Sequence, residues 1–143
     1  GPTALVLSRQ DVPVLPGTDP DGVARGAYVL VDAREPDIVL VGTGSEVSLC
    51  VEAAGLLADQ EVTSRVVSMP SWELFAAQSD EYQTSVLPPE VPTLAVEAAD
   101  SVSLDRFGAS APGDIALANL GYTPENVADR ARQLVHDLQE VDG

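Results

Sequence analysis

The sequence contains no lysine. Its seven basic residues are all arginine and stand against 23 acidic residues, which gives a formal net charge of −16. Such a chain repels polyanions, because it has no stripe of basic side chains to displace the counterions of a nucleic acid. We therefore expect no nucleic acid among its partners. The acids are scattered along the chain, which is typical of a solvated acidic surface.

Cysteine and histidine occur once each, as Cys50 and His136. A single cysteine excludes an internal disulfide, and these two residues cannot build a thiolate cluster or a two-histidine metal site. No apolar run approaches the roughly 18 to 20 residues of a membrane span. The start, Gly1-Pro2-Thr3, has no secretory signal pattern. We expect a soluble, cytoplasmic protein without a membrane partner.

The most informative stretch runs from Asp37 to Ala54 in a chain of 143 residues and 14.9 kDa. Asp37 to Val41 is a β-branched apolar run that predicts a buried strand, and Gly42-Thr43-Gly44 then changes the pattern to a helical period. We expect Ser45 to cap this helix and Glu46 to face the positive end of its dipole. The apolar stripe predicted for it consists of Val47, Cys50, Val51, Ala54, Leu57 and Ala58.

Further strands are expected on both sides of this stretch. Ala27 to Asp32 lies only four residues ahead of the next strand, which permits an antiparallel neighbour and no parallel one. Val62 to Ser68 follows the helix and completes a right-handed βαβ unit, and Thr93 to Ala98 adds another strand. The predicted fold class is α/β, a three-layer Rossmann-like sheet, mostly parallel with one antiparallel edge strand.

The ends of the chain differ from this core. Residues 11–26 contain three prolines and three glycines among polar residues, which is typical of a linker. Thr3 to Leu7 is a lone apolar strand ahead of that linker, so we interpret residues 1–10 as the tail of a preceding domain. Residues 27–143 form the α/β domain. A short helix is expected at Asp114 to Asn119, and a final helix after Thr123 carries the stripe Val127, Ala131, Leu134 and Leu138.

One connection is too short for this layout. Only three residues separate the strand ending at Ala98 from the expected strand Val102 to Phe107, and a parallel pair needs a crossover of a dozen or more. Either the two strands form a hairpin, or a segment of the protein is missing from the numbered sequence.

Candidate sites are few. Gly42-Thr43-Gly44-Ser45-Glu46-Val47 follows a strand, but Val47 replaces the third glycine of a dinucleotide fingerprint, and no acid ends the next strand. A tight turn is the better interpretation. Glu97, Asp105 and Arg106 are expected near the carboxyl ends of strands, where a surface salt bridge is favoured over a ligand site. His136 is expected to face solvent, opposite the stripe of the last helix.

A colinear set of short motifs resembles the C-terminal part of transketolase between about residues 2 and 138. The motifs are Pro2 to Gln10, Gly42 to Val47, Val66 to Ser71, Tyr82 with Ser85 to Pro88, Val96 to Ala98, Phe107 to Pro112, and Gly121 to Val127.

The resemblance implies an enzyme that uses thiamine diphosphate with Mg²⁺ or Ca²⁺. It implies a homodimer that transfers two-carbon ketol units between ketose and aldose sugar phosphates of the pentose phosphate pathway, with the cofactor as electron sink. The residues that hold the cofactor and metal lie in the preceding domains of that family, and this sequence has no Gly-Asp-Gly run. We expect the isolated chain to be inactive, with a structural or regulatory role, and to bind neither cofactor nor metal.

One functional residue carries over from the resemblance. Arg9 matches the arginine of the Ser-Arg-Gln motif, which contacts the substrate phosphate in transketolases. A guanidinium suits this role because it is permanently charged and grips phosphate oxygens with two N–H groups. The alternative is a linker arginine in a surface salt bridge. We assign no catalytic residue to the chain.

The resemblance also bears on the short connection. Transketolases usually carry a longer, aromatic-containing segment after the motif Val96-Glu97-Ala98, so we predict a loop that the numbered sequence omits and an intact mass clearly above 14.9 kDa.

The rival hypothesis for the whole chain is a free-standing α/β module that binds a small ligand or a nucleotide above the sheet.

Overall fold

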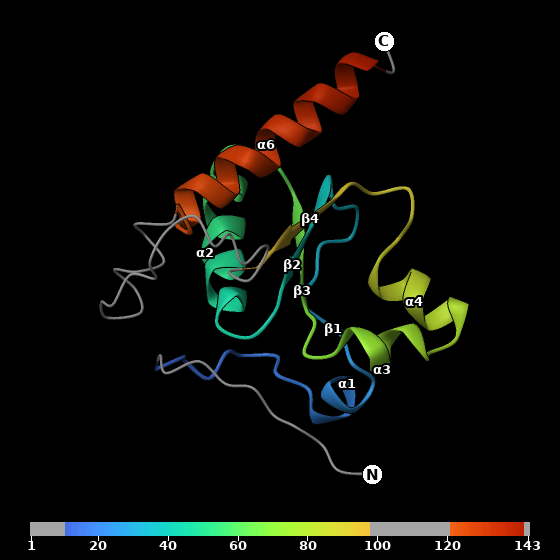
Figure 1. Ribbon diagram of the computed structural model, residues 1–143. Helices are drawn as coiled ribbons and strands as arrows, with labels where there is room; N and C mark the ends of the chain where they lie inside the picture. Colours follow the sequence, from blue (N-terminus) through green and yellow to red (C-terminus); the bar gives the residue numbers. More distant parts are fainter. Residues whose placement is uncertain (1–10, 98–120, 142–143) are drawn as a thin grey trace, which may run out of the picture.

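The computed structural model of the chain describes residues 11–97 and 121–141. These residues form three layers, with the sheet between two groups of helices (Figure 1). In chain order the elements are α1 (Pro20–Ala24), β1 (Tyr28–Val31), β2 (Ile38–Gly42), α2 (Glu46–Ala58), β3 (Ser64–Ser68), α3 (Trp72–Ala76), α4 (Asp80–Val86), β4 (Thr93–Val96) and α6 (Pro124–Val141).

The sheet has the strand order β1-β3-β2-β4. β2, β3 and β4 are parallel, while β1 lies antiparallel to β3 at the edge, with Tyr28 opposite Ser68. This arrangement confirms the predicted fold class. The short turn between β1 and β2 does not join sheet neighbours, because β3 pairs between them.

β2 is the centre of the core, and all five of its residues are buried. Ile38 and Leu40 point toward α2 and α6, while Val39 and Val41 point toward α3 and α4. This alternation divides the core into two apolar clusters, one on each face of the sheet. A central parallel strand therefore reads as a continuous apolar run, as the sequence indicated.

α2 buries a wider surface than the predicted stripe. Val47, Cys50 and Leu57 are buried as expected, but Ala53 is also fully buried, and Ala58 at the end of the helix is exposed. The reason is that α2 packs against both the sheet and α6, which lies beside it on the same face. On α6, the predicted stripe is buried at Val127 and Ala131, half-buried at Leu134 and exposed at Leu138.

Other predictions are refined or lie outside the described residues. The stretch predicted as a linker contains α1, which begins because the Asp19 carboxylate accepts a hydrogen bond from the Asp21 amide and Pro20 takes the first position. Three expected elements lie outside the described residues: the strands Thr3 to Leu7 and Val102 to Phe107 and the helix Asp114 to Asn119.

In the described ranges, no helix combines the length and apolar character needed to cross a bilayer.

Candidate functional site

The order in which the chain adds strands to the sheet reverses between β2 and β4, although the two strands are parallel. From β2 the chain passes through α2 on one face to β3, and from β3 it passes through α3 and α4 on the other face to β4, which returns beside β2. Gly42 and Val96 end these two neighbouring strands in register. Open α/β sheets bind ligands at such a point, beyond the carboxyl ends of the strands.

The turn after β2 is tight. A Cβ atom on Gly42 would lie 2.8 Å from the Cα of Val47 and 3.1 Å from the Sγ of Cys50, and Gly44 has a φ of +63°. Both positions therefore require glycine, one for the close approach of α2 to the strand and one for left-handed backbone. This turn brings the start of α2 directly against the sheet.

A carboxylate lies where a phosphate would have to bind. Glu46 is only 7% exposed in the first turn of α2, and its Oε1 accepts a hydrogen bond from the Ser45 hydroxyl at 3.2 Å. The Ser45 hydroxyl thus bonds to Glu46 and does not cap the helix, which corrects the prediction for Ser45. Because the buried negative charge already faces the helix dipole, the turn does not favour an anion. This agrees with the interpretation of the motif as a structural turn.

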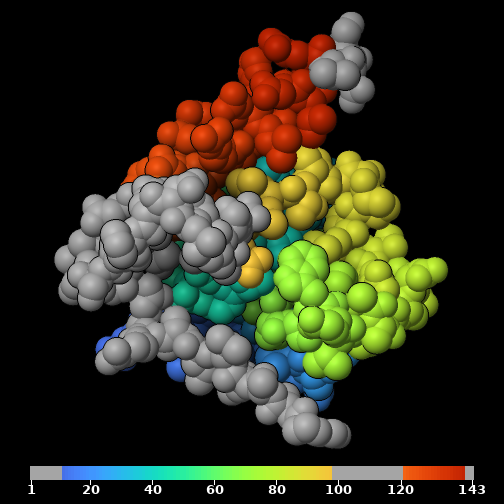
Figure 2. Space-filling view, in the orientation of Figure 1, coloured from blue at the N-terminus to red at the C-terminus, as the bar shows by residue number. Residues whose placement is uncertain are grey.

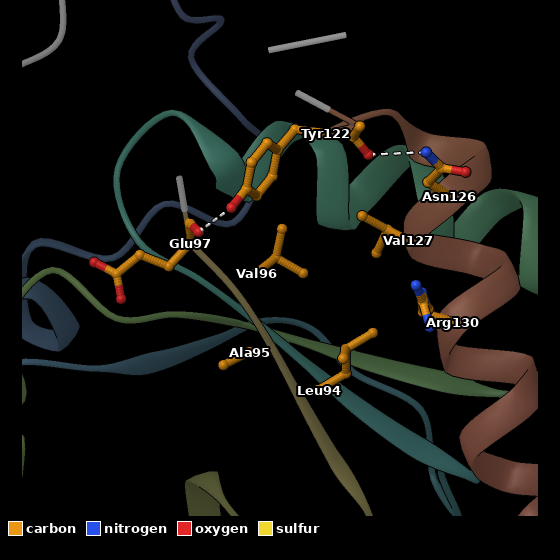
Figure 3. A pocket seen from close by; sticks show the side chains of 9 residues that line it. Leu94, Ala95, Val96, Glu97, Tyr122, Asn126, Val127 and Arg130 are labelled. Atoms are coloured by element: carbon orange, nitrogen blue, oxygen red, sulfur yellow. Dashed lines mark hydrogen bonds between the residues drawn. The ribbon is translucent and has the colours of Figure 1, made fainter. Parts of the chain in front are cut away.

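A pocket of about 490 Å³ lies beside β4, between this strand and α6 (Figure 3). Leu94, Val96 and Val127 supply its apolar wall, and Arg130 reaches into it from α6. The Tyr122 hydroxyl donates to the Glu97 carbonyl oxygen at 2.7 Å, which ties the start of α6 to the end of β4. These described residues include no pair of a nucleophile and a base.

Cys50 is chemically protected. Burial, together with the smaller effect of the nearby Glu46 carboxylate, raises the pKa of its thiol from 9.0 to about 12. Since the thiolate is the reactive form, a thiol in this environment is a core residue and not a nucleophile.

We expect native Cys50 to resist a water-soluble disulfide reagent. At pH 8, a pKa of about 12 in place of 9.0 lowers the thiolate fraction about 1,000-fold, so the reaction is expected to be slower by at least that factor than in denaturant. The thiol of the unfolded chain ionises at a lower pH than the native thiol, so the folded state loses stability as the pH rises from 9 to 12. Cys50→Ala is expected to remove this loss. Rapid modification of the native protein would contradict the assignment.

The predicted site residues have different outcomes. Arg9, Asp105 and Arg106 lie outside the described residues. Glu97 is exposed immediately after β4, as expected, and no described cation lies in ion-pair distance of it. His136 is exposed on α6, with its Nε2 3.9 Å from a Glu140 carboxylate oxygen, which confirms that it faces solvent. Sequence reasoning missed the burial of Glu46, because its position in the first turn gave no sign of what covers it.

Three comparisons with known proteins point to the same family. Residues 26–123 match the family described as the transketolase-like C-terminal domain. The chain is 48% identical to a transketolase of Nostoc sp. over 149 positions and 44% identical to transketolase 1 of Saccharomyces cerevisiae over 144, each covering 94% of this chain. Those alignments span only 22% and 21% of the two relatives, so this chain corresponds to about a fifth of their length.

Solved structures show the same likeness. A transketolase of Pichia stipitis in complex with sedoheptulose 7-phosphate superimposes with a TM-score of 0.85 at 38% identity, covering 92% of this chain and 21% of that one. A transketolase of Leishmania mexicana superimposes with a TM-score of 0.83 at 41% identity, covering 90% and 21%.

The alignments also bear on the short connection after Ala98. The Nostoc alignment has 149 positions, more than the 143 residues of this chain, so the relative has residues without a counterpart here. The junction itself lies outside the described residues, and the predicted additional loop stays a prediction. The family match, the identity over nearly the whole chain and the shared fold together show that this chain belongs to the transketolase family and corresponds to its C-terminal domain.

Proposed function

We propose that this chain is the C-terminal domain of a full-length transketolase that transfers two-carbon ketol units from ketose phosphates to aldose phosphates. The observation that carries the proposal is the match to transketolases over 94% of this chain at 48% identity. The substrate class is supported by relatives solved with xylulose 5-phosphate and sedoheptulose 7-phosphate. We further propose a cytoplasmic homodimer of the full-length polypeptide, acting in the pentose phosphate pathway.

The cofactor belongs to the rest of that polypeptide in this proposal. Thiamine diphosphate with a divalent metal supplies the electron sink for breaking a carbon–carbon bond next to a carbonyl. Within residues 11–97 and 121–141, no three acidic, histidine or cysteine side chains lie together as metal ligands. The charge of Glu46 at the turn after β2 also disfavours a diphosphate there. These residues do not fit the group, and the isolated chain is expected to be inactive.

Within the chain, we propose that Arg9 contacts the substrate phosphate and that residues 1–10 are the tail of the preceding domain. In the full-length enzyme, Arg9→Ala is expected to raise KM for phosphorylated substrates about 10-fold or more, because it removes a charge-assisted pair of hydrogen bonds. The value of kcat/KM for an unphosphorylated ketose donor is expected to stay nearly unchanged. Arg34→Ala is the matched control, since Arg34 is an exposed arginine in the turn between β1 and β2.

The activity assay uses the complete reading frame, with xylulose 5-phosphate as donor and thiamine diphosphate and Mg²⁺ added. Ketol transfer by the full-length protein and none by the 143-residue chain is the expected result. A complete reading frame without ketol transfer would overturn the proposal. Micromolar binding of a nucleotide to the isolated chain by calorimetry would favour the rival, a free-standing ligand-binding module.

A further inference from the structure

A tight turn ahead of α1 fixes the direction of the chain. Pro16 and Gly17 are its two central residues, and Gly17 has a φ of +87°, which is typical of the third residue of a type II turn. The Thr18 amide and hydroxyl both donate to the Leu15 carbonyl oxygen, at 3.3 Å and 2.7 Å. A proline, a glycine and two hydrogen bonds therefore define this turn, which consists of residues 15–18.

The turn lies against the edge strand β1. A Cβ atom on Gly17 would lie 2.9 Å from the Leu30 carbonyl oxygen and 3.6 Å from the Leu30 Cδ1 atom. The oxygen belongs to the backbone of a strand, so it cannot rotate away from a side chain at position 17. Any residue other than glycine must therefore shift the turn away from β1.

The chain on the other side of the turn is anchored as well. It continues into α1, and the Ser71 amide at the start of α3 donates to the Gly26 carbonyl oxygen just after α1, at 3.0 Å. Figure 2 shows this part of the chain (blue) lying against α3 (light green). The turn is thus a fixed point between α1 and the residues that precede it.

Residues 11–15 run from this fixed point toward the amino terminus, and we call them the connecting segment. A hollow of about 240 Å³ is lined by Val12 and Pro13 of this segment and by Ser45 and Ser68. Ser68 ends β3 and Ser45 follows the turn after β2, so the segment passes the carboxyl ends of both strands (Figure 1). Since residues 11–14 are exposed and a hollow lies beside them, the turn, and not packing against the sheet, holds the segment.

The connecting segment is stiff. Pro13 and Pro16 have fixed φ angles, and the residue before each of them, Val12 or Leu15, is restricted to extended backbone. A stiff segment transmits the orientation of its fixed end to its other end, whereas a glycine-rich segment does not. The turn therefore constrains the position of Asp11.

Arg9 is two residues ahead of Asp11, so the Cα atoms of the two residues are at most about 7.6 Å apart. We propose that the turn of residues 15–18 is a positioning element, which acts through the connecting segment to hold Arg9 where it binds the substrate phosphate. Paired hydrogen bonds from a guanidinium are directional, and a displacement of about 1 Å can cost as much as about 100-fold in rate. This inference rests on the proposed function of Arg9.

The test measures ketol transfer by the full-length protein from xylulose 5-phosphate and from an unphosphorylated ketose donor. Gly17→Ala is expected to raise KM for the phosphorylated donor about 3- to 10-fold, because it displaces Arg9. Its effect cannot exceed that of Arg9→Ala, since it acts through that residue. The value of kcat/KM for the unphosphorylated donor is expected to stay nearly unchanged.

Gly121→Ala is the matched control. Gly121 has a similar φ of +88°, and a Cβ there would meet only the Asn126 side chain, at 3.5 Å. The variant therefore carries a comparable backbone strain outside the turn and the connecting segment. It is expected to match the wild type with both donors.

Thr18→Val is a milder variant of the same turn. It removes the hydroxyl hydrogen bond to the Leu15 carbonyl oxygen and keeps the shape of an exposed side chain, so the fold is preserved. Its KM for xylulose 5-phosphate is expected to rise about 2- to 5-fold, as for the loss of one hydrogen bond. Thr18→Ser, which keeps the hydroxyl, is expected to retain the wild-type value.

A double-variant cycle shows whether the turn acts through Arg9. If it does, Arg9→Ala combined with Gly17→Ala has the same KM as Arg9→Ala alone, since the contact is already lost. Additive effects on KM would overturn the inference, as would an equal loss of activity with both donors or an unchanged KM in Gly17→Ala and Thr18→Val. With ketol transfer intact and Arg9→Ala impaired, each of these results overturns the inference alone, whereas absence of ketol transfer overturns the proposed function as well.

Discussion

Gly26→Ala is expected to destabilise the domain by about 3 to 5 kcal/mol, a large part of the roughly 5 to 15 kcal/mol that stabilises a native domain. Gly26 has a φ of +90°, and a Cβ there would collide with the Phe75 amide nitrogen and lie 2.5 Å from the Ser71 carbonyl oxygen. Both partners are backbone atoms that cannot rotate away. Relieving the collision must separate α1 from α3 and break the hydrogen bond from the Ser71 amide to the Gly26 carbonyl oxygen.

Urea unfolding followed by circular dichroism measures this effect. Gly55→Ala is the matched control: a Cβ on Gly55 meets nothing within 4 Å, and this residue lies inside α2. Alanine there is expected to stabilise the protein by about 0.5 to 1 kcal/mol, because glycine is the poorer helix former. If Gly26→Ala lowers the stability no more than a surface substitution does, then Gly26 does not contact the start of α3 in solution.

Leu57→Ala is expected to cost about 3 to 5 kcal/mol. Leu57 is completely buried in the cluster that α2 and α6 form on one face of the sheet. Truncation removes its transfer free energy and leaves a cavity, because α2 packs against both the sheet and α6 and these contacts limit collapse. The m value is expected to be unchanged, since the unfolding transition still exposes nearly the same surface.

Leu138→Ala on α6 serves as the comparison for Leu57→Ala. Leu138 is 43% exposed, and its truncation is expected to change the free energy of unfolding by less than about 1 kcal/mol. Similar losses of unfolding free energy for the two variants would mean that the last turns of α6 also pack against the rest of the molecule in solution.

Much of the fold could be predicted because the signals were local. The continuous apolar run from Asp37 to Val41, the glycines after it and the helical period that follows predict a buried strand and a helix, and the structure has both. The short turn after Ala27 to Asp32 indicated an antiparallel edge strand, and β1 is one, but it pairs with β3 and not with β2, the strand that the turn leads to. The departures of Glu46 and Val47 from a dinucleotide fingerprint were also visible in the sequence.

The candidate site was less accessible to prediction. The prediction that Ser45 caps α2 was wrong because its hydroxyl donates to the neighbouring Glu46 carboxylate. Whether a serine bonds to a side chain or to the backbone depends on the rotamers of both side chains. The hydrogen bond from Tyr122 to the Glu97 carbonyl oxygen joins residues 25 apart along the chain, and no local pattern indicates it. The proposal for Arg9 rests on the resemblance of a motif, since a single arginine in a polar stretch has no distinguishing pattern.

The sequence by itself determined that the segments β1, β2 and β3 are strands, that β1 is antiparallel at the edge, and to which family the chain belongs. Each of these depends on neighbouring residues: the period of apolar side chains, the length of a turn and the order of motifs. Only the tertiary structure decided the strand order β1-β3-β2-β4 and the burial of Glu46. These features arise from contacts between distant segments, whose free energies depend on the whole packed chain and not on any one stretch of it.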